Sequence, residues 1–257
     1  MLEDEQIRIL TKKEYLVVKG NELIQKSRFE LSLQEQKTIA YICSMIKPID
    51  TLDRINRVPF QLEYEFSIRD YCKVCGIDYN NGKNYTDIKN TLKQLRDRSM
   101  WISLENGDET VVGWLDRVTT NKRSGIVKVR IDDRLAPYLF ELQEKFTKYE
   151  LYNILAMKSA FSIRIYELMK SYAFQGTKIF YIDELKHLLM VNKIKSYERF
   201  PDFRRYVLEK AQEEINRLTD LTISYETITK GRKVVKIKFL IKQKGVAERM
   251  KVVWREN

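Results

Sequence analysis

Apolar residues in the first half of the chain recur at a helical spacing in three places. Residues 31–46 (LSLQEQKTIAYICSMI) begin with Ser32 and Glu35 at the separation of a capping box. Residues 66–76 (FSIRDYCKVCG) and 85–99 (YTDIKNTLKQLRDRS) are two further amphipathic stretches. The pattern therefore predicts three helices.

Strand patterns follow the third helix. Residues 101–118 (WISLENGDETVVGWLDRV) predict two strands joined at Asn106-Gly107, a strong hairpin signal. Residues 125–132 (GIVKVRID) alternate apolar and polar positions and predict another strand.

The second half repeats this order. Two helices are predicted at residues 149–174 and 181–191, and a third at 202–218, where Asp202 could cap the N-terminus. Residues 222–241 predict a hairpin that turns near Lys230-Gly231, and residues 102–105 (ISLE) match residues 223–226 (ISYE) at an offset of 121. The sequence thus indicates an internal duplication.

Three helices followed by a hairpin is the order of a winged helix, in which the third helix enters the major groove and the hairpin contacts the DNA backbone. We therefore predict an α+β chain of two tandem winged-helix domains, residues 1–134 and 135–257, that meet near residues 132–146 (DDRLAPYLFELQEKF).

Composition agrees with a folded cytoplasmic protein. Gly and Pro are scarce, at 9 and 4 of 257 residues, and the N-terminal residues lack the pattern of a secretion signal. Cys72 and Cys75 form a C-x2-C pair, but a zinc site needs two more Cys or His ligands, and only Cys43 and His187 remain. We expect reduced structural cysteines and no metal or other cofactor.

The formal net charge of +11 is concentrated near the C-terminus. Residues 176–257 hold 19 Lys+Arg against 11 Asp+Glu, a net +8, which leaves +3 for the first 175 residues. Residues 229–244 (TKGRKVVKIKFLIKQK) contain seven basic residues and no acid. This asymmetry indicates a polyanionic partner, which is nucleic acid or an anionic membrane surface.

Arg204 and Arg205 fall in the first turn of the helix predicted at 202–218. The helix dipole is positive there and favours acids by about 0.3–1 kcal/mol per charge. The placement is favourable if DNA docks at this end, because arginines can then meet phosphates or guanine edges. The alternative is that Arg205 pairs with Glu209 at i,i+4 and that Arg204 is solvated.

The remaining DNA-contact candidates surround the two third helices and the hairpin tips. In the second half they are Lys193, Lys195, Tyr197, Arg199, Lys210, Lys230, Arg232, Lys233 and Lys236. In the first half they are Lys83, Asn84, Lys89, Lys93, Lys122 and Arg123. The tip at residues 105–110 (ENGDET) is acidic and suits a phosphate-contacting wing poorly. We expect the C-terminal domain to dominate DNA affinity.

Three segments resemble the replication initiators of theta-replicating plasmids, which are built of two winged-helix domains. They are residues 16–46 (LVVKGNELIQKSRFELSLQEQKTIAYICSMI), 138–172 (YLFELQEKFTKYELYNILAMKSAFSIRIYELMKSY) and 199–226 (RFPDFRRYVLEKAQEEINRLTDLTISYE). The resemblance extends over about residues 15–242.

This resemblance implies a function. Such initiators bind direct repeats (iterons) in the origin as monomers, melt neighbouring DNA and recruit the host initiator and helicase. Many also form homodimers through the N-terminal domain that repress their own gene and limit copy number. By position, Tyr197, Arg199, Arg204, Arg205 and Lys210 match the family's DNA-reading region.

Other classes of protein fit less well. A rolling-circle nickase needs a histidine pair, which His187 alone cannot supply, and no G-x4-GK[ST] loop is present, so we expect no enzyme. The carboxylate pairs at 132–133 and 213–214 are adjacent residues and are expected to be surface charge. Membrane binding through residues 229–244 is weak, because the hairpin would bury its apolar side. A winged-helix transcriptional regulator without an initiator role remains the alternative.

Overall fold

The computed structural model describes residues 15–47, 60–79, 82–140, 142, 145–249 and 251–252. Within them, two modules share one order of elements: helix, strand, helix, helix and a two-stranded hairpin. The first module comprises α3 (Leu33–Ser44), β3 (Glu63–Ser67), α5 (Ile68–Cys75), α6 (Gly82–Asp97), β6 (Leu115–Asn121) and β7 (Ile126–Ile131). The second comprises α9 (Ala160–Ser171), β9 (Thr177–Tyr181), α10 (Ile182–Leu188), α11 (Phe200–Phe203), α12 (Lys210–Leu218), β10 (Leu221–Lys230) and β11 (Lys233–Gln243).

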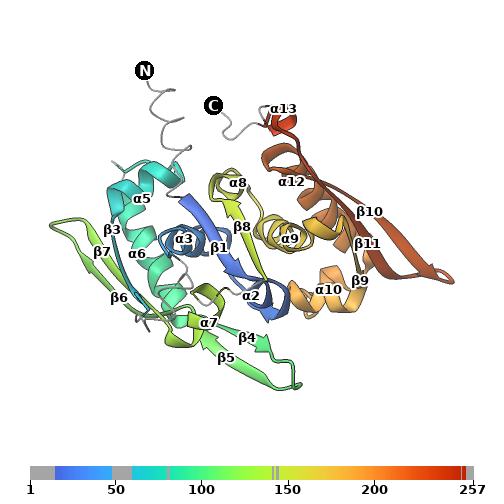
Figure 1. The fold of residues 1–257 in the computed structure, drawn as a ribbon, viewed down its shortest axis with the longest axis horizontal. Coiled ribbons are helices and arrows are strands. Elements are labelled where there is room, and N and C mark those ends of the chain that lie inside the picture. The colour runs from blue at the N-terminus through green and yellow to red at the C-terminus, as the bar shows by residue number, and fades with distance from the viewer. Residues whose placement is uncertain are drawn as a thin grey trace.

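The sheets of the two modules have equivalent topology. In each, the strand before the second helix pairs with the last strand of the hairpin, which gives the orders β3-β7-β6 and β9-β11-β10. All these pairings are antiparallel. The α+β class and two winged-helix modules are therefore confirmed, and Figure 1 shows the two hairpins projecting from opposite ends of the molecule.

The hairpin at Asn106-Gly107 exists but is not the wing of the first module. Its strands, β4 (Ser99–Ser103) and β5 (Glu109–Gly113), form a separate sheet with β2 (Ser27–Arg28). The strand equivalent to β10 is β6, so the match of residues 102–105 to 223–226 is wrong. The prediction failed because similar strand sequences do not reveal which strands pair.

The two modules meet at a short antiparallel ribbon of β1 (Leu16–Gly20) and β8 (Phe146–Glu150), with Val18 opposite Lys148. Between the wings in Figure 1, this ribbon lies beside α3 and α9. The other described α-helices are the short helices α2 (Asn21–Lys26), α7 (Ala136–Leu139), α8 (Tyr152–Leu155) and α13 (Val246–Arg249).

A buried ionic cluster fixes this junction. Lys19 Nζ lies 2.6 Å from Glu167 Oε1, and the Tyr149 hydroxyl donates to the same oxygen at 2.6 Å. Burial alone would raise the pKa of Glu167, but the Lys19 ammonium, the Tyr149 hydroxyl and the Arg164 guanidinium together outweigh it and leave the pKa below its ordinary value. These three residues come from β1, β8 and α9, so the cluster ties together segments far apart in the sequence.

The single helix predicted over 149–174 is interrupted, because β8 ends at Glu150 and α9 begins only after Ser159. The Ser159 side chain caps α9 by accepting from the Ser162 amide. The Glu214 carboxylate accepts from the amides of Lys158 at 3.0 Å and Ser159 at 3.3 Å. Glu214 is thus buried, and the prediction that it is surface charge was wrong.

Asp132 is also buried rather than part of a charged surface. Its carboxylate accepts from the Gly113 amide at 3.2 Å and from the Arg134 amide at 3.0 Å. The Arg134 side chain and amide, together with the Gly113 amide, hold the pKa of this carboxyl below its ordinary value. Both carboxylates that were wrongly predicted to be surface charge accept hydrogen bonds from backbone N–H groups. Two adjacent acidic residues in a sequence do not reveal this role.

Candidate nucleic-acid interface

The third helix of the second module begins two residues earlier than predicted. It starts at Phe200, with Pro201 in its first turn and Arg199 as the N-cap, whose side chain makes no capping bond. Asp202 is therefore not the cap, and its carboxylate instead lies 3.6 Å from Arg199 Nε. Proline favours the first helical turn because it lacks an N–H to satisfy. Arg204 and Arg205 consequently lie in the second turn, and the placement at the first turn was wrong.

A π-helical segment, Arg204–Glu209, runs between α11 and α12. Arg204 Nε lies 3.1 Å from Glu209 Oε1, so the ion pair joins residues i and i+5. The expected alternative, Arg205 with Glu209, is not formed, because a π turn is one residue wider than an α turn. Arg205 instead places its guanidinium 5.4 Å from the ring centroid of Tyr206. Within the described ranges, no carboxylate lies within ion-pair distance of Arg205.

The apolar face of this helix sets the direction of its charged face. Buried side chains follow the whole helix: Phe203, Val207, Leu208, Ala211, Ile215 and Leu218. Arg204, Arg205 and Lys210 are exposed as a result. Packing of the hydrophobic stripe therefore presents these three cations together to solvent.

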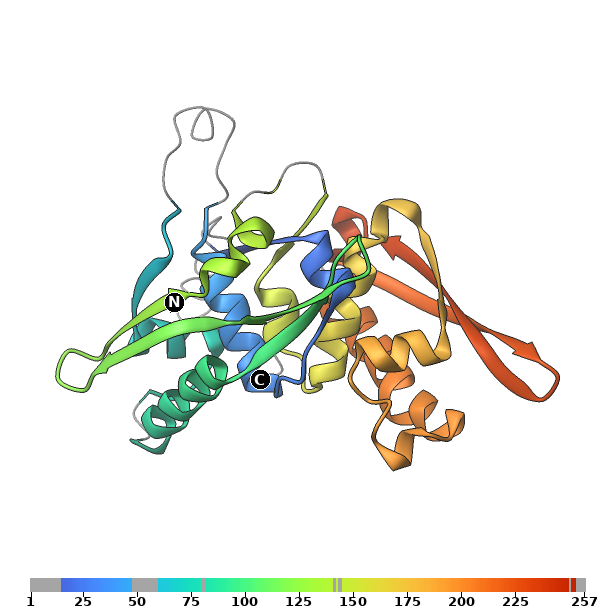
Figure 2. The ribbon, with the colours of Figure 1, turned by 90° about the horizontal axis from the view of Figure 1, so that it is seen from below.

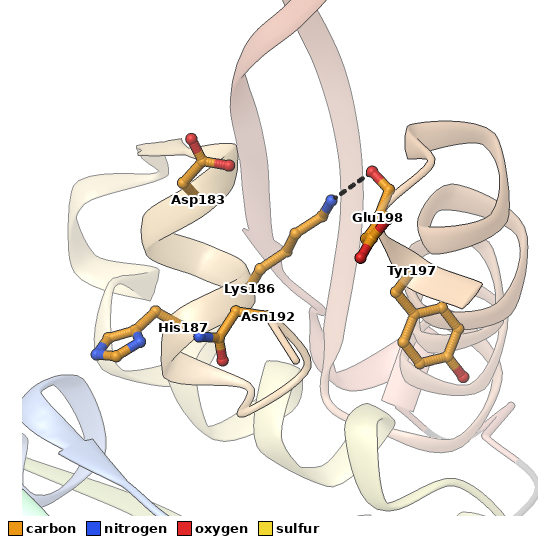
Figure 3. Close-up of a pocket in the computed structure, with 6 residues that line it drawn as sticks. All are labelled: Asp183, Lys186, His187, Asn192, Tyr197 and Glu198. Atoms are coloured by element: carbon orange, nitrogen blue, oxygen red, sulfur yellow. Dashed lines mark hydrogen bonds between the residues drawn. The ribbon is translucent and has the colours of Figure 1, made fainter. Parts of the chain in front are cut away.

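The segment before this helix is held by a buried lysine from α10. Lys186 Nζ donates to the main-chain carbonyl of Glu198 at 3.1 Å and lies 5.4 Å from the ring centroid of Phe203. Desolvation lowers the pKa of Lys186. Figure 3 shows this bond beside a pocket that Asp183, His187, Asn192 and Tyr197 also line. The tether fixes the turn between the two helices.

The predicted residues of this approach differ in exposure. Lys193, Lys195 and Arg199 are exposed. Tyr197 is half-buried and packs edge-on against Phe161, with ring centroids 6.1 Å apart. Tyr197 thus belongs partly to the support of the turn.

The wing of the second module carries its cations at the tip. Lys230, Arg232 and Lys233 are exposed around Gly231, whose φ of +63° gives the turn a conformation that favours glycine. Lys236 lies lower on the sheet, where its Nζ is 4.4 Å from the ring centroid of Tyr181. The predicted wing is therefore a basic hairpin with its charge concentrated at its end.

In the first module the equivalent helix is α6. Lys83, Lys89 and Lys93 are exposed on it. The Asn84 side chain donates through Nδ2 to the main-chain carbonyl of Asp78 at 2.6 Å and thus links the start of α6 to the residues after α5.

The wing of the first module is β6–β7, so its tip holds Lys122 and Arg123. The Asn121 side chain shapes this turn by accepting from the amides of Arg123 at 2.9 Å and Ser124 at 3.1 Å. The prediction that the acidic hairpin at residues 105–110 is this wing was wrong, and the first wing has a basic tip.

Figure 2 shows how the two modules are oriented. The N-terminal ends of α6 and α11 lie on the same, lower side of the molecule, and the two wings extend to either end. The predicted contact elements of both modules thus lie on or beside the same side of the molecule.

Sequence reasoning missed the residues that support this face. Lys186 was not singled out, and Glu209 was considered only as a partner of Arg205, because the actual partners depend on the turn and on the π segment. His187 Nε2 lies 2.9 Å from Arg28 Nη1, and Arg28 also pairs with Glu109. The histidine thus connects α10 to the β2-β4-β5 sheet, a contact that no local motif signals.

The part of the chain that the structure describes gives little support for a metal site, a disulfide or a membrane span. No group of three His, Cys, Asp or Glu side chains there could hold a metal ion. Cys43 and Cys72 are buried, Cys75 is partly exposed, and none of the three forms a disulfide. No described helix is both long and apolar enough for a membrane span.

Comparison with known proteins agrees with this architecture. Residues 16–170 match the family described as "Initiator Replication protein, WH1", and residues 181–241 match "Initiator Rep protein, WH2". The fold is similar to the "Crystal structure of Pi initiator protein in complex with iteron DNA", with a TM-score of 0.72, 21% identity, and coverage of 91% of this chain and 100% of that one.

Two curated relatives come from Escherichia coli. A "Replication initiation protein" is 26% identical over 217 residues, which are 82% of this chain and 65% of the relative. The "PI protein" is 29% identical over 153 residues, 53% of this chain and 49% of the relative. The chain thus spans less than two thirds of each of these relatives. Since the two family matches together extend over most of its length, the chain belongs to the initiator replication protein family.

Proposed function

We propose that this cytoplasmic protein binds direct repeats in a plasmid origin and starts replication there. The observation that carries this function is the exposed trio Arg204, Arg205 and Lys210, presented on the third helix of a winged-helix module. The similar Pi initiator is described in complex with iteron DNA. Major-groove readout by arginine is the commonest specific contact to guanine.

The two modules contribute unequally in this proposal. Residues 135–257 supply the main DNA contacts through the helix, its approach and the wing tip at Lys230, Arg232 and Lys233. Residues 1–134 add weaker contacts through α6 and the tip at Lys122 and Arg123. The remaining proposed contact residues are Lys83, Asn84, Lys89, Lys93, Lys193, Lys195, Tyr197, Arg199 and Lys236.

Footprinting the protein on the DNA that flanks its own gene tests this function. Phased repeats protected in the same orientation support an initiator. One inverted repeat alone would favour the alternative, a winged-helix transcriptional regulator. A plasmid that carries the footprinted region should replicate only when the protein is supplied.

Arg204→Ala and Arg205→Ala test the contacts themselves. Each should weaken binding to the cognate repeat by about 1–3 kcal/mol if the residue reads a base. If the sequence preference is unchanged in both variants, the two arginines contact phosphates and do not read bases.

We further propose that the bound protein helps melt adjacent DNA and recruits the host initiator and helicase. Two unequal modules on one face suit asymmetric direct repeats and leave the opposite face open to proteins. Permanganate reactivity of thymines beside the repeats measures melting. If these thymines stay unreactive with saturating protein, the protein does not melt the adjacent DNA.

Homodimerisation through the first module, with repression of the protein's own gene, completes the proposal. Trp101 and Val111 lie opposite each other in the β2-β4-β5 sheet and are 45% and 40% exposed. β5 is an edge strand of this sheet, and exposed edges can pair with a second chain. Trp101→Ser should lower the dimer fraction in sedimentation, while Tyr79→Ser, a change of another exposed aromatic residue, should not.

A further inference from the structure

A pocket of about 390 Å³ opens where the two modules meet. It lies between the start of β8, the end of α9 and the end of β11, and its lining includes Lys145, Phe146, Lys148, Phe174 and Gln243. None of the predicted DNA-contact residues lines it. The function proposed above therefore leaves this pocket unused.

Two phenylalanines give the pocket an unusual apolar surface. Phe174 is 81% exposed, and Phe146 is 36% exposed. Phe174 sits in a tight turn in which the Gly176 amide donates to the Ala173 carbonyl at 3.2 Å. The Gly176 carbonyl in turn accepts from the Ile241 amide at 2.8 Å, so the turn is anchored to β11. The ring is thus held in solvent by a fixed backbone.

The charged side chains that line this pocket are basic. Among the described residues, the lining holds three lysines and no carboxylate. Lys170 is committed to Asp220. Lys148 lies with its Nζ 4.8 Å from the ring centroid of Phe146, and within the described residues neither Lys148 nor Lys145 has a carboxylate at ion-pair distance. The pocket therefore complements an apolar group flanked by acids.

The position of the pocket argues for a protein as its occupant. In Figure 2 the start of β8 and the turn after α9 lie on the upper side, away from the N-terminal ends of α6 and α11. An occupant can therefore bind while DNA occupies the lower face. A single strand of DNA needs a basic track along several nucleotides, whereas this pocket offers only Lys145 and Lys148 as lysines without a carboxylate partner among the described residues.

We propose that this pocket, the Phe146–Phe174 pocket, docks an acidic segment of a protein partner through an apolar anchor residue. The inference rests on the proposed function only in that the partner meets the DNA-bound chain. The anchor packs against the two rings, and its acidic neighbours pair with Lys145 and Lys148. Aromatic anchors in a partly enclosed site carry much of the affinity in interfaces of this kind.

Fluorescence anisotropy with the full chain bound to its origin repeat tests the pocket. The probe is a labelled peptide of Asp, Glu and Leu with one central Phe, and its partner probe has Ser at every apolar position. The first peptide should bind at least about tenfold tighter than the second. Phe174→Ser should remove most of this difference, and Lys148→Glu should weaken the binding of both acidic peptides. Tyr79→Ser, outside the pocket, should leave both affinities unchanged.

Three outcomes would overturn the inference: equal binding of the two peptides, peptide binding unaffected by Phe174→Ser, or displacement of the peptide by oligothymidylate that itself depends on Phe174. The last would make the pocket a site for single-stranded DNA. Repeat binding is measured on the same variants and should be unchanged. If the unmodified protein does not bind the repeat, the proposed function is wrong. Failure of the pocket inference and failure of the proposed function are therefore distinguishable.

Discussion

The ion pair between Arg204 and Glu209 makes a sharp prediction about DNA affinity. Glu209 engages Nε of Arg204 and offsets the charge of its guanidinium, so we expect the pair to open when Arg204 binds DNA. Its side chains are 52% and 50% exposed, which places it among surface ion pairs of about 0.2–1 kcal/mol. Glu209→Gln should release Arg204 and tighten binding by roughly 1.4- to 5-fold.

Glu209→Gln also removes the repulsion between this carboxylate and the DNA phosphates. A double-mutant cycle separates this effect from the release of Arg204. Binding of the origin repeat is measured for Glu209→Gln, Arg204→Ala and the combined variant. Glu213→Gln, on the same helix, is the matched charge control. If Glu209→Gln tightens binding equally with and without Arg204, the pair does not restrain the arginine, and the reasoning fails.

Three other changes test separate parts of the molecule. Lys233→Ala should weaken binding to all DNA sequences alike. Titrations at several salt concentrations should show that the slope of log affinity against log salt falls by about one unit. An unchanged slope would show that Lys233 does not contact the DNA backbone. Lys186→Met frees the Glu198 carbonyl and loosens the turn. It should therefore cost more free energy of repeat binding than free energy of unfolding, the latter followed by thermal denaturation. An unaltered affinity would show that the tether is dispensable. Glu167→Gln leaves Lys19 buried without a counter-charge and should reduce the free energy of unfolding by about 3–5 kcal/mol in urea titrations.

Glu167 also determines a pH dependence. Its pKa in the folded state lies below its unfolded value, so its contribution is complete above the ordinary glutamate pKa, about 4.3, and declines as the pH falls through the folded value. The unmodified protein should therefore lose stability in this acid range more steeply than Glu167→Gln. Parallel curves for the two proteins would contradict the assignment.

Local patterns predicted the elements whose signals lie within a few residues. The predicted capping box of α3 is in place, because the Ser32 side chain accepts from the Glu35 amide three residues away. The buried face of the third helix in the second module follows its apolar spacing. Such features depend on neighbours in the sequence, so the sequence alone determines them.

Features that depend on distant partners were missed. Five-residue strands such as β1, β3, β8 and β9 carry little signal of their own and exist because a remote strand pairs with them. The role of the acidic hairpin at residues 105–110 was mistaken because strand order is a property of the assembled sheet.

By itself, the sequence determined two winged-helix modules, a basic second wing and a cationic third helix, since periodicity and charge are local quantities. Only the tertiary structure decided which hairpin forms the first wing, which carboxylates are buried, and that Arg204 pairs with Glu209. It also created the Phe146–Phe174 pocket, whose two rings are 28 positions apart in the chain. The physical reason is that pairing, burial and pockets arise between surfaces that meet only after the chain has folded.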